Sequence, residues 1–243
     1  MKLIIEKDYE NISKRAANEI LKIVNNKEHS ILGLATGSSP VGLYEELIKL
    51  NEEKKIDFSK VTTINLDEYI GISNNHPQSY RYFMNDTLFN HINIDKNNTY
   101  VPNGNAEDME AECVGYDKKI RDLGGIDLQL LGIGGNGHIA FNEPDEELVV
   151  GTHVTGLTQS TIEANSRFFD SIDEVPKKAI TMGLGEIMKA KSIILIASGK
   201  GKAEAIAKLF SGKITTKSPA TLLAVHNDVT IIIDEQAASL LNQ

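Results

Sequence analysis

A glycine-rich segment, Gly132–Pro144 (G-I-G-G-N-G-H-I-A-F-N-E-P), carries the residues best suited to chemistry. It follows the apolar run Ile126–Leu131, which is typical of a buried strand. Ligands of open α/β sheets bind beyond the carboxyl ends of strands, and glycine lets the backbone approach them closely. His138 can transfer protons near neutral pH. Glu143 could hydrogen-bond its imidazole and set its tautomer, and Asn136 could orient the ring or bind a substrate hydroxyl.

The glycines of this segment also match a dinucleotide-binding pattern, which we consider and do not favour. Gly132, Gly134 and Gly137 fit G-x-G-x-x-G after a strand. A dinucleotide-binding site also needs a helix that starts at this point and an acidic residue about 20 residues further on. Pro144 interrupts a long helix, and residues 149–158 contain no Asp or Glu. We therefore expect no nucleotide cofactor.

A small-residue turn, Leu34–Pro40 (L-A-T-G-S-S-P), follows another apolar run and precedes a helical pattern. Backbone N–H groups and hydroxyls at such a helix start point toward an anion. The candidate phosphate ligands are Thr36, Gly37, Ser38 and Ser39. The alternative is an ordinary helix start, with Ser39 as the cap and Pro40 at the first helical position. The turn by itself does not decide between the two.

Two adjacent carboxylates lie in Asn65–Tyr69 (N-L-D-E-Y), at the end of the apolar run Val61–Asn65. Their side chains point in different directions, so one could face a site while the other supports it. Asp67 next to a sugar carbon could act as a general base. The alternative is a solvated acid in a turn.

Two basic residues are candidates for binding a phosphate. Arg167 lies in A-N-S-R-F-F-D, and Lys202 lies in S-G-K-G-K-A at the predicted start of a helix. A cation there opposes the helix dipole unless an anion is bound nearby, although exposure to solvent would make the placement harmless. We expect no metal site, because His138 has no second imidazole at helical spacing.

Alternating apolar runs and helical patterns must position these residues. Predicted strands are Lys2–Ile5, Ser30–Ala35, Val61–Asn65, Ile126–Gly132, Lys178–Met182, Ser192–Ala197 and Val229–Ile233. Predicted helices are Asp8–Asn26, Val41–Asn51, Gln78–Leu88, Ala106–Leu123, Gly183–Met188, Lys200–Phe210 and Ala237–Leu241. The alternation indicates an α/β, doubly wound, Rossmann-like fold with a mostly parallel sheet and helices on both faces.

Composition sets limits on the class of protein. The 243 residues contain no repeat or low-complexity linker, so we expect one domain over residues 1–243, with a lid at about residues 142–160. A net charge of −9 disfavours non-specific binding to nucleic acid or membranes. Cys113 is the single cysteine, and the sequence shows neither a signal-peptide pattern nor an apolar run long enough to span a membrane. We therefore expect a cytoplasmic protein.

Taken together, these segments resemble the glucosamine/galactosamine-6-phosphate isomerase family, which includes the glucosamine-6-phosphate deaminases. The matching stretches run in the family's order from Leu32 to about Met188: L-G-L-A-T-G-S-S-P, N-L-D-E-Y, H-P-Q-S-Y-R-Y-F-M, G-I-G-G-N-G-H-I-A-F-N-E-P, A-N-S-R-F-F-D and T-M-G-L-G-E-I-M. The stretch G-H-I-A-F-N-E-P is the most specific of them. The resemblance implies conversion of glucosamine 6-phosphate and water to fructose 6-phosphate and ammonia, in amino-sugar catabolism and without a cofactor.

The resemblance also implies a role for each candidate residue. His138 would open the pyranose ring by proton transfer to the ring oxygen, with Glu143 and Asn136 orienting and tuning it. Asp67 would take the proton from C2 and return it at C1. Ser38, Ser39, Arg167 and Lys202 would bind the phosphate.

Two departures from the family pattern qualify this expectation. Many members carry Asp at the position of Asn136, so His138 should rely more on Glu143. Members activated by N-acetylglucosamine 6-phosphate have basic residues where this chain has His153 and Thr155. We therefore expect little such activation and a monomer or small homo-oligomer. The alternatives are a 6-phosphogluconolactonase, which typically carries Arg at the position of Tyr69, and a non-catalytic sugar-phosphate sensor.

Overall fold

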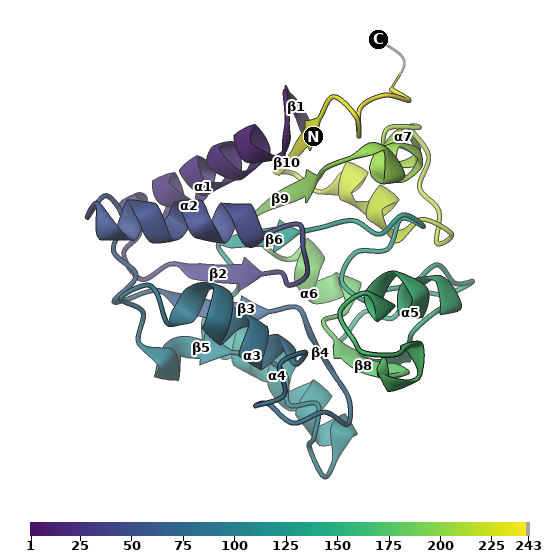
Figure 1. Cartoon of the computed structure of the whole chain (residues 1–243), viewed down its shortest axis with the longest axis horizontal. Helices are drawn as coiled ribbons and strands as arrows, with labels where there is room; N and C mark the ends of the chain where they lie inside the picture. Colours follow the sequence, from purple (N-terminus) through teal and green to yellow (C-terminus); the bar gives the residue numbers. More distant parts are fainter. Residues whose placement is uncertain (242–243) are drawn as a thin grey trace.

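The computed structural model describes residues 1–241, and its main feature is a seven-stranded sheet (Figure 1). The strand order is β1-β10-β9-β6-β2-β3-β5, and every neighbouring pair is parallel. The strands of this sheet are β1 (Lys2–Glu6), β2 (Ile31–Leu34), β3 (Thr62–Asn65), β5 (Thr99–Tyr100), β6 (Leu128–Leu131), β9 (Ser192–Ala197) and β10 (Val229–Asp234). Every residue of β2 and β6 is buried, as expected for strands covered on both faces.

Helices surround this sheet, which confirms the predicted doubly wound α/β fold. They are α1 (Tyr9–Asn26), α2 (Val41–Glu52), α3 (Tyr80–Met84), α4 (Met109–Asp122), α5 (Gln159–Ser166), α6 (Leu184–Met188) and α7 (Ala203–Leu209). In Figure 1, α1, α2 and α3 lie in front of the sheet and α6 lies behind it. Most buried apolar side chains form one cluster between these layers.

A second, antiparallel sheet of three strands lies beside the first, in the order β4-β8-β7. Its strands are β4 (Asp67–Tyr69), β7 (His153–Gly156) and β8 (Lys178–Thr181). Leu66 joins the two sheets, because its N–H donates to the Leu34 carbonyl and its own carbonyl accepts from Met182. The residue that follows it, Asp67, is therefore held where the chain passes from one sheet to the other.

The strand order creates a crevice between β2 and β6. From β2 the chain continues to β3 on one side, and from β6 it continues to β9 on the other side. The loops that leave the carboxyl ends of β2 and β6 consequently diverge, which is where open α/β sheets bind ligands. Both loops were identified from the sequence as candidate binding segments.

Several predicted elements differ from the structure. Lys178–Met182 is a strand, as predicted, but β8 belongs to the antiparallel sheet. The predicted helix Ala237–Leu241 is wrong, because this segment forms turns. The Asp234 carboxylate accepts a hydrogen bond from the Ala237 N–H. The helix predicted from Ala106 begins at Met109, since the Asp108 side chain caps it.

Two further predicted helices change type along their length. Gln78–Leu88 was expected to be one helix, but α3 ends at Met84 and a π-helical turn, Asn85–Phe89, follows. Lys200–Phe210 begins as a 3₁₀ turn, Lys200–Lys202, before α7. Other 3₁₀ turns, which the sequence did not indicate, are Lys96–Asn98, Ile172–Glu174 and Pro219–Val225.

The region expected to be an irregular lid, residues 142–160, contains regular structure. It includes all of β7, which pairs with β8, and the first residues of α5. Short strands such as β7 draw their stability from pairing with distant segments, so local pattern does not reveal them. Movement of this region stays a prediction.

Candidate active site

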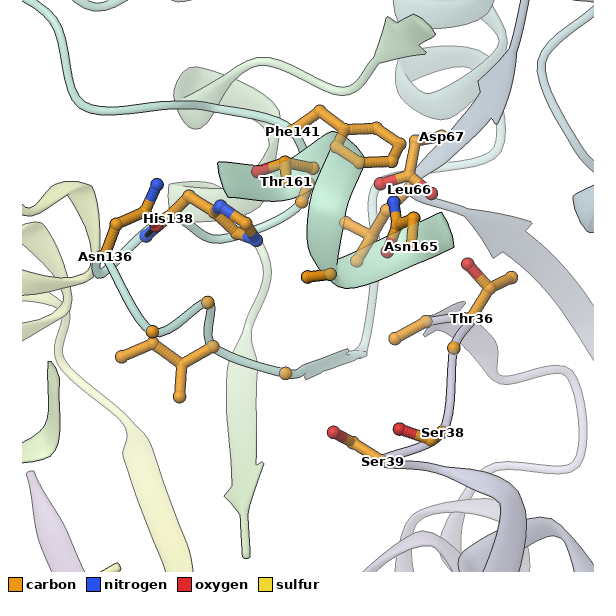
Figure 2. A pocket seen from close by; sticks show the side chains of 18 of the residues that line it. Thr36, Ser38, Ser39, Leu66, Asp67, Asn136, His138, Phe141, Thr161 and Asn165 are labelled. Atoms are coloured by element: carbon orange, nitrogen blue, oxygen red, sulfur yellow. Dashed lines mark hydrogen bonds between the residues drawn. The ribbon is translucent and has the colours of Figure 1, made fainter. Parts of the chain in front are cut away.

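A cavity of about 380 Å³ opens at the crevice between β2 and β6 (Figure 2). Four strand ends contribute to its wall: the turn after β2, Leu66–Asp67 after β3, the glycine-rich loop after β6, and Lys202 after β9. Helix α5 and Tyr80 of α3 contribute further parts of the wall. All the predicted site residues except Glu143 line this cavity, and Glu143 forms hydrogen bonds with three residues that do: Asn136, His138 and Thr161.

His138 and Glu143 form a hydrogen-bonded pair at one end of the cavity. The His138 Nδ1 lies 3.0 Å from Glu143 Oε2, which confirms the contact expected from their spacing. A carboxylate at Nδ1 favours the tautomer with its proton there and leaves Nε2 available to a ligand. The pair therefore has the arrangement of an oriented acid–base relay.

Asn136 acts on the carboxylate of this pair rather than on the ring. Its Nδ2 donates to Glu143 Oε2 at 2.8 Å, and its Oδ1 accepts the backbone N–H of His138 at 3.1 Å. The sequence left open whether Asn136 orients the imidazole or binds a substrate hydroxyl. Both of its polar groups are occupied within the loop, which favours an orienting role.

Thr161 of α5 completes the surroundings of Glu143 and was missed from the sequence. Its hydroxyl donates to Glu143 Oε1 at 2.5 Å. Burial opposes ionisation of Glu143, but hydrogen bonds from His138, Thr161 and Asn136 outweigh it and lower the pKa of the carboxyl group. Glu143 is thus held as a carboxylate beside the imidazole.

Asp67 faces the cavity some distance from the relay (Figure 2). Its side chain is 6% exposed and has no hydrogen-bond partner among residues 1–241. Burial, reinforced by the neighbouring Glu68 carboxylate, raises the pKa of Asp67 to about 8. A carboxylate in such surroundings is a stronger base than an exposed one.

Glu68 points away from the cavity and supports α3, as the sequence suggested for one member of the acidic pair. Its carboxylate accepts the backbone N–H groups of Tyr69, Tyr80 and Arg81 at 2.8–2.9 Å. The N–H groups of Tyr80 and Arg81 lie in the first turn of α3, where backbone N–H groups have no hydrogen-bond partner within the helix. The alternation of side chains along β4 thus separates a chemical carboxylate from a structural one.

The turn after β2 lies at the other end of the cavity. Pro40 rather than Ser39 occupies the cap position of α2, and no side chain caps this helix. The expected alternative, with Ser39 as the cap and Pro40 as the first helical residue, is therefore wrong. The hydroxyls of Thr36, Ser38 and Ser39 remain on the wall of the cavity beside an uncapped helix start.

Two cations come to this end of the cavity from distant parts of the chain. Arg167 donates from Nη2 to Ser38 Oγ at 3.0 Å, and Lys202 donates from Nζ to the Ile133 carbonyl at 2.7 Å. Burial lowers the pKa of the Lys202 ammonium, and the nearby Arg167 lowers it further. Within residues 1–241 neither cation forms an ion pair with a carboxylate, so the site suits an anion.

The loop after β6 requires glycine at two positions for this geometry. A Cβ atom on Gly134 would lie 2.5 Å from the His138 ring. Gly137 has φ +90°, and a Cβ there would lie 2.2 Å from Ser218 Oγ. The glycines therefore serve to pack and turn the loop that presents His138.

Residues in the described part of the chain show neither a metal site nor a membrane span. Residues 1–241 hold no group of three or more His, Cys, Asp or Glu side chains placed to bind a metal ion. No helix in the same range is long and apolar enough to cross a membrane.

Comparison with known proteins identifies a matching family and similar relatives over nearly the whole chain. The family model described as glucosamine-6-phosphate isomerases/6-phosphogluconolactonase matches residues 6–232. The chain is 65% identical, over 241 residues, to a glucosamine-6-phosphate deaminase of Clostridium perfringens, covering 99% of this chain and 100% of that protein. It is 56% identical, with the same coverage, to a glucosamine-6-phosphate deaminase of Halothermothrix orenii.

Solved structures give the same result. A monomeric glucosamine-6-phosphate deaminase superposes with a TM-score of 0.97 at 48% identity, covering 99% of this chain and 100% of that one. A 6-phosphogluconolactonase from Trypanosoma cruzi superposes with a TM-score of 0.76 at 21% identity, covering 100% of this chain and 97% of that one. The second likeness shows a shared fold only.

Proposed function

The chain belongs to the family of glucosamine-6-phosphate isomerases and 6-phosphogluconolactonases, and we propose that it is a glucosamine-6-phosphate deaminase. It converts D-glucosamine 6-phosphate and water to D-fructose 6-phosphate and ammonia. The observation that carries this proposal is the placement of two separate proton-transfer groups in a cavity with an anion site. Asp67 and the His138–Glu143 pair line different parts of the wall, and Arg167 and Lys202 lie at one end.

Ring opening is assigned to His138. Its imidazole moves a proton from the C1 hydroxyl to the ring oxygen, so that the C1–O5 bond breaks and an aldehyde forms. Glu143, held by Asn136, stabilises the imidazolium that forms during this transfer. The neutral amide of Asn136 leaves Glu143 as the charged partner of the ring.

Isomerisation is assigned to Asp67. Its carboxylate takes the proton from C2, giving an enolamine, and returns a proton at C1 to give a ketimine. Water then adds to C2 of the ketimine and ammonia leaves, which gives fructose 6-phosphate. The raised pKa of Asp67, about 8, supports this assignment, because a base is most effective when its pKa lies near the working pH.

Phosphate binding is assigned to the turn after β2 together with the two cations. Thr36, Gly37, Ser38 and Ser39 supply hydroxyls and backbone N–H groups, and Arg167 and Lys202 supply charge. The phosphate is remote from the reacting carbons, so its binding energy can hold C1 and C2 against Asp67. We propose a cytoplasmic enzyme that needs no cofactor and works as a monomer or small homo-oligomer.

Ammonia release tests the proposal directly. The purified chain is incubated with glucosamine 6-phosphate, and ammonia and fructose 6-phosphate are measured, with 6-phosphogluconolactone as the control substrate. We expect equal amounts of the two products and no enzymatic hydrolysis of the lactone. Lactone hydrolysis without ammonia release would support the 6-phosphogluconolactonase alternative, and binding without turnover would support a sensor.

A further inference from the structure

Helix α5 connects the three functional segments of the cavity. Its Thr161 contacts Glu143 of the relay, and its Asn165 donates to the Tyr69 hydroxyl at 2.9 Å, two residues beyond Asp67. Arg167, at its C-terminal cap, contacts Ser38 of the phosphate turn. Figure 2 shows Thr161 and Asn165 on the helix that lies across the cavity. Helix α5 and its C-terminal cap residue therefore touch the relay, the base strand and the phosphate turn.

Thr161 is the least expected of these contacts, and its surroundings fix the direction of its hydroxyl. The side chain is 5% exposed, so water does not compete freely for it. Thr158, which caps the first turn of α5, donates its hydroxyl to Thr161 Oγ1 at 3.0 Å. The Thr161 proton is thereby directed to Glu143 Oε1.

The other oxygen of Glu143 is already shared. Oε2 accepts from both His138 Nδ1 and Asn136 Nδ2, whereas Oε1 has Thr161 as its hydrogen-bond partner among the described residues. Loss of the Thr161 hydroxyl would leave Oε1 buried without that partner. The carboxylate could then rotate, and its bond to the imidazole would lose its fixed geometry.

We propose that Thr161 is a positioning residue for ring opening, which holds Glu143 in place and links the relay to the helix that carries Arg167. The inference rests on the proposed function and adds to it a physical route from phosphate to relay. An anion held by Arg167 fixes the C-terminal end of α5, and Thr161 near its start transmits that placement to Glu143. The phosphate then helps to assemble the ring-opening group as well as to anchor the substrate.

The test separates ring opening from deamination. In an Asp67→Asn background, where we expect no isomerisation, the interconversion of the α and β anomers of glucosamine 6-phosphate reports ring opening. Exchange NMR measures this rate for the parent and for added Thr161→Val or Thr161→Ser, after subtraction of the uncatalysed rate. Thr155→Val is the matched control, because the Thr155 hydroxyl contacts only its neighbour's carbonyl among the described residues. Affinity for the reduced, open-chain aminoalditol phosphate is measured in parallel.

We expect Thr161→Val to slow anomer interconversion by about tenfold, as the loss of a hydrogen bond to a charged group implies. Thr161→Ser and Thr155→Val should stay within about threefold of the parent, as should the affinity of every variant for the open-chain compound. Unchanged interconversion in Thr161→Val would overturn the inference. The inference would also be overturned if Thr161→Ser slowed interconversion as much as Thr161→Val and if affinity for the open-chain compound fell equally. This outcome would indicate a merely structural role. If the wild-type chain releases no ammonia, the proposed function fails instead.

Discussion

Two carboxylates of this site have their pKa values moved in opposite directions by their surroundings. Asp67 is buried without a hydrogen-bond partner among the described residues, which raises its pKa, whereas three donors lower the pKa of the buried Glu143. Such a division is how one site holds a base and an ionised supporting group at the same pH. The contact of Glu143 with His138 could be predicted because five residues separate them across a short turn. The pKa of Asp67 could not, because its burial depends on pairing between β4 and the distant β8.

Lys202→Ala tests the anion site. We expect KM to rise at least tenfold and kcat to fall less than threefold, because Lys202 would contribute a charge-assisted hydrogen bond to the phosphate but none to the reacting carbons. Steady-state kinetics on glucosamine 6-phosphate measure both constants. Lys200→Ala, an exposed lysine of the same 3₁₀ turn, is the matched control and should change neither. An unchanged KM in Lys202→Ala would remove Lys202 from phosphate binding.

At the scale of elements, the loop after β6 and helix α5 together shape the relay, and they differ in how well the sequence reveals them. The loop could be recognised because glycine, histidine and glutamate are close in sequence and follow an apolar run. Helix α5 lies within and beyond the expected lid, and Thr161 is 18 residues from Glu143 with no local pattern to connect them. The contacts that α5 makes are set by tertiary packing, so they were not predictable from one sequence.

The loop's backbone geometry gives a prediction about stability. Gly137→Ala should lower the free energy of unfolding by about 2–4 kcal/mol, because its φ of +90° disfavours a side chain and the Cβ would collide with Ser218. Urea denaturation measures the change. Gly115→Ala is the matched control: it lies in α4 with open space around its Cβ, and should stabilise by about 0.5–1 kcal/mol. Equal effects of the two substitutions would contradict the role assigned to Gly137.

The sheet of the whole molecule brings together residues spread from Thr36 to Lys202. The fold class of this sheet could be predicted from the sequence, but its strand order could not. Alternating strands and helices predicted a parallel sheet, and this is confirmed. The antiparallel sheet was not foreseen, because β4 and β7 are short and pair with a strand far along the chain. We propose that the chain folds as one domain, with most buried apolar residues in a single cluster.

The buried Asp67 also affects the stability of the whole fold. Its pKa of about 8 exceeds the unfolded value of 3.8, so the folded chain holds a proton that the unfolded chain releases. The contribution of this proton to the free energy of unfolding is fully present below about pH 4, weakens as the pH rises, and is lost above about pH 8. Asp67→Asn should therefore gain stability relative to the wild type between these limits, on the order of 2–5 kcal/mol by pH 8. Urea denaturation from pH 5 to 9 measures it; a difference independent of pH would contradict the raised pKa.

Regulation and assembly are also properties of the whole molecule. The family resemblance implies basic residues in activated members where this chain has His153 and Thr155, so we expect a flat response of activity to N-acetylglucosamine 6-phosphate. Light scattering should give a mass near the chain's 26.7 kDa or a small multiple of it. A sigmoidal response that the effector converts to a hyperbolic one would contradict this expectation.

The most direct test of the assigned roles follows glucosamine 6-phosphate by NMR with the wild type and with Asp67→Asn. We expect the wild type to form fructose 6-phosphate and ammonia. Asp67→Asn should form neither, yet it should still bind the sugar phosphate and accelerate the exchange of its anomers through His138. Formation of fructose 6-phosphate by Asp67→Asn at a rate near that of the wild type would contradict the assignment of Asp67 as the base.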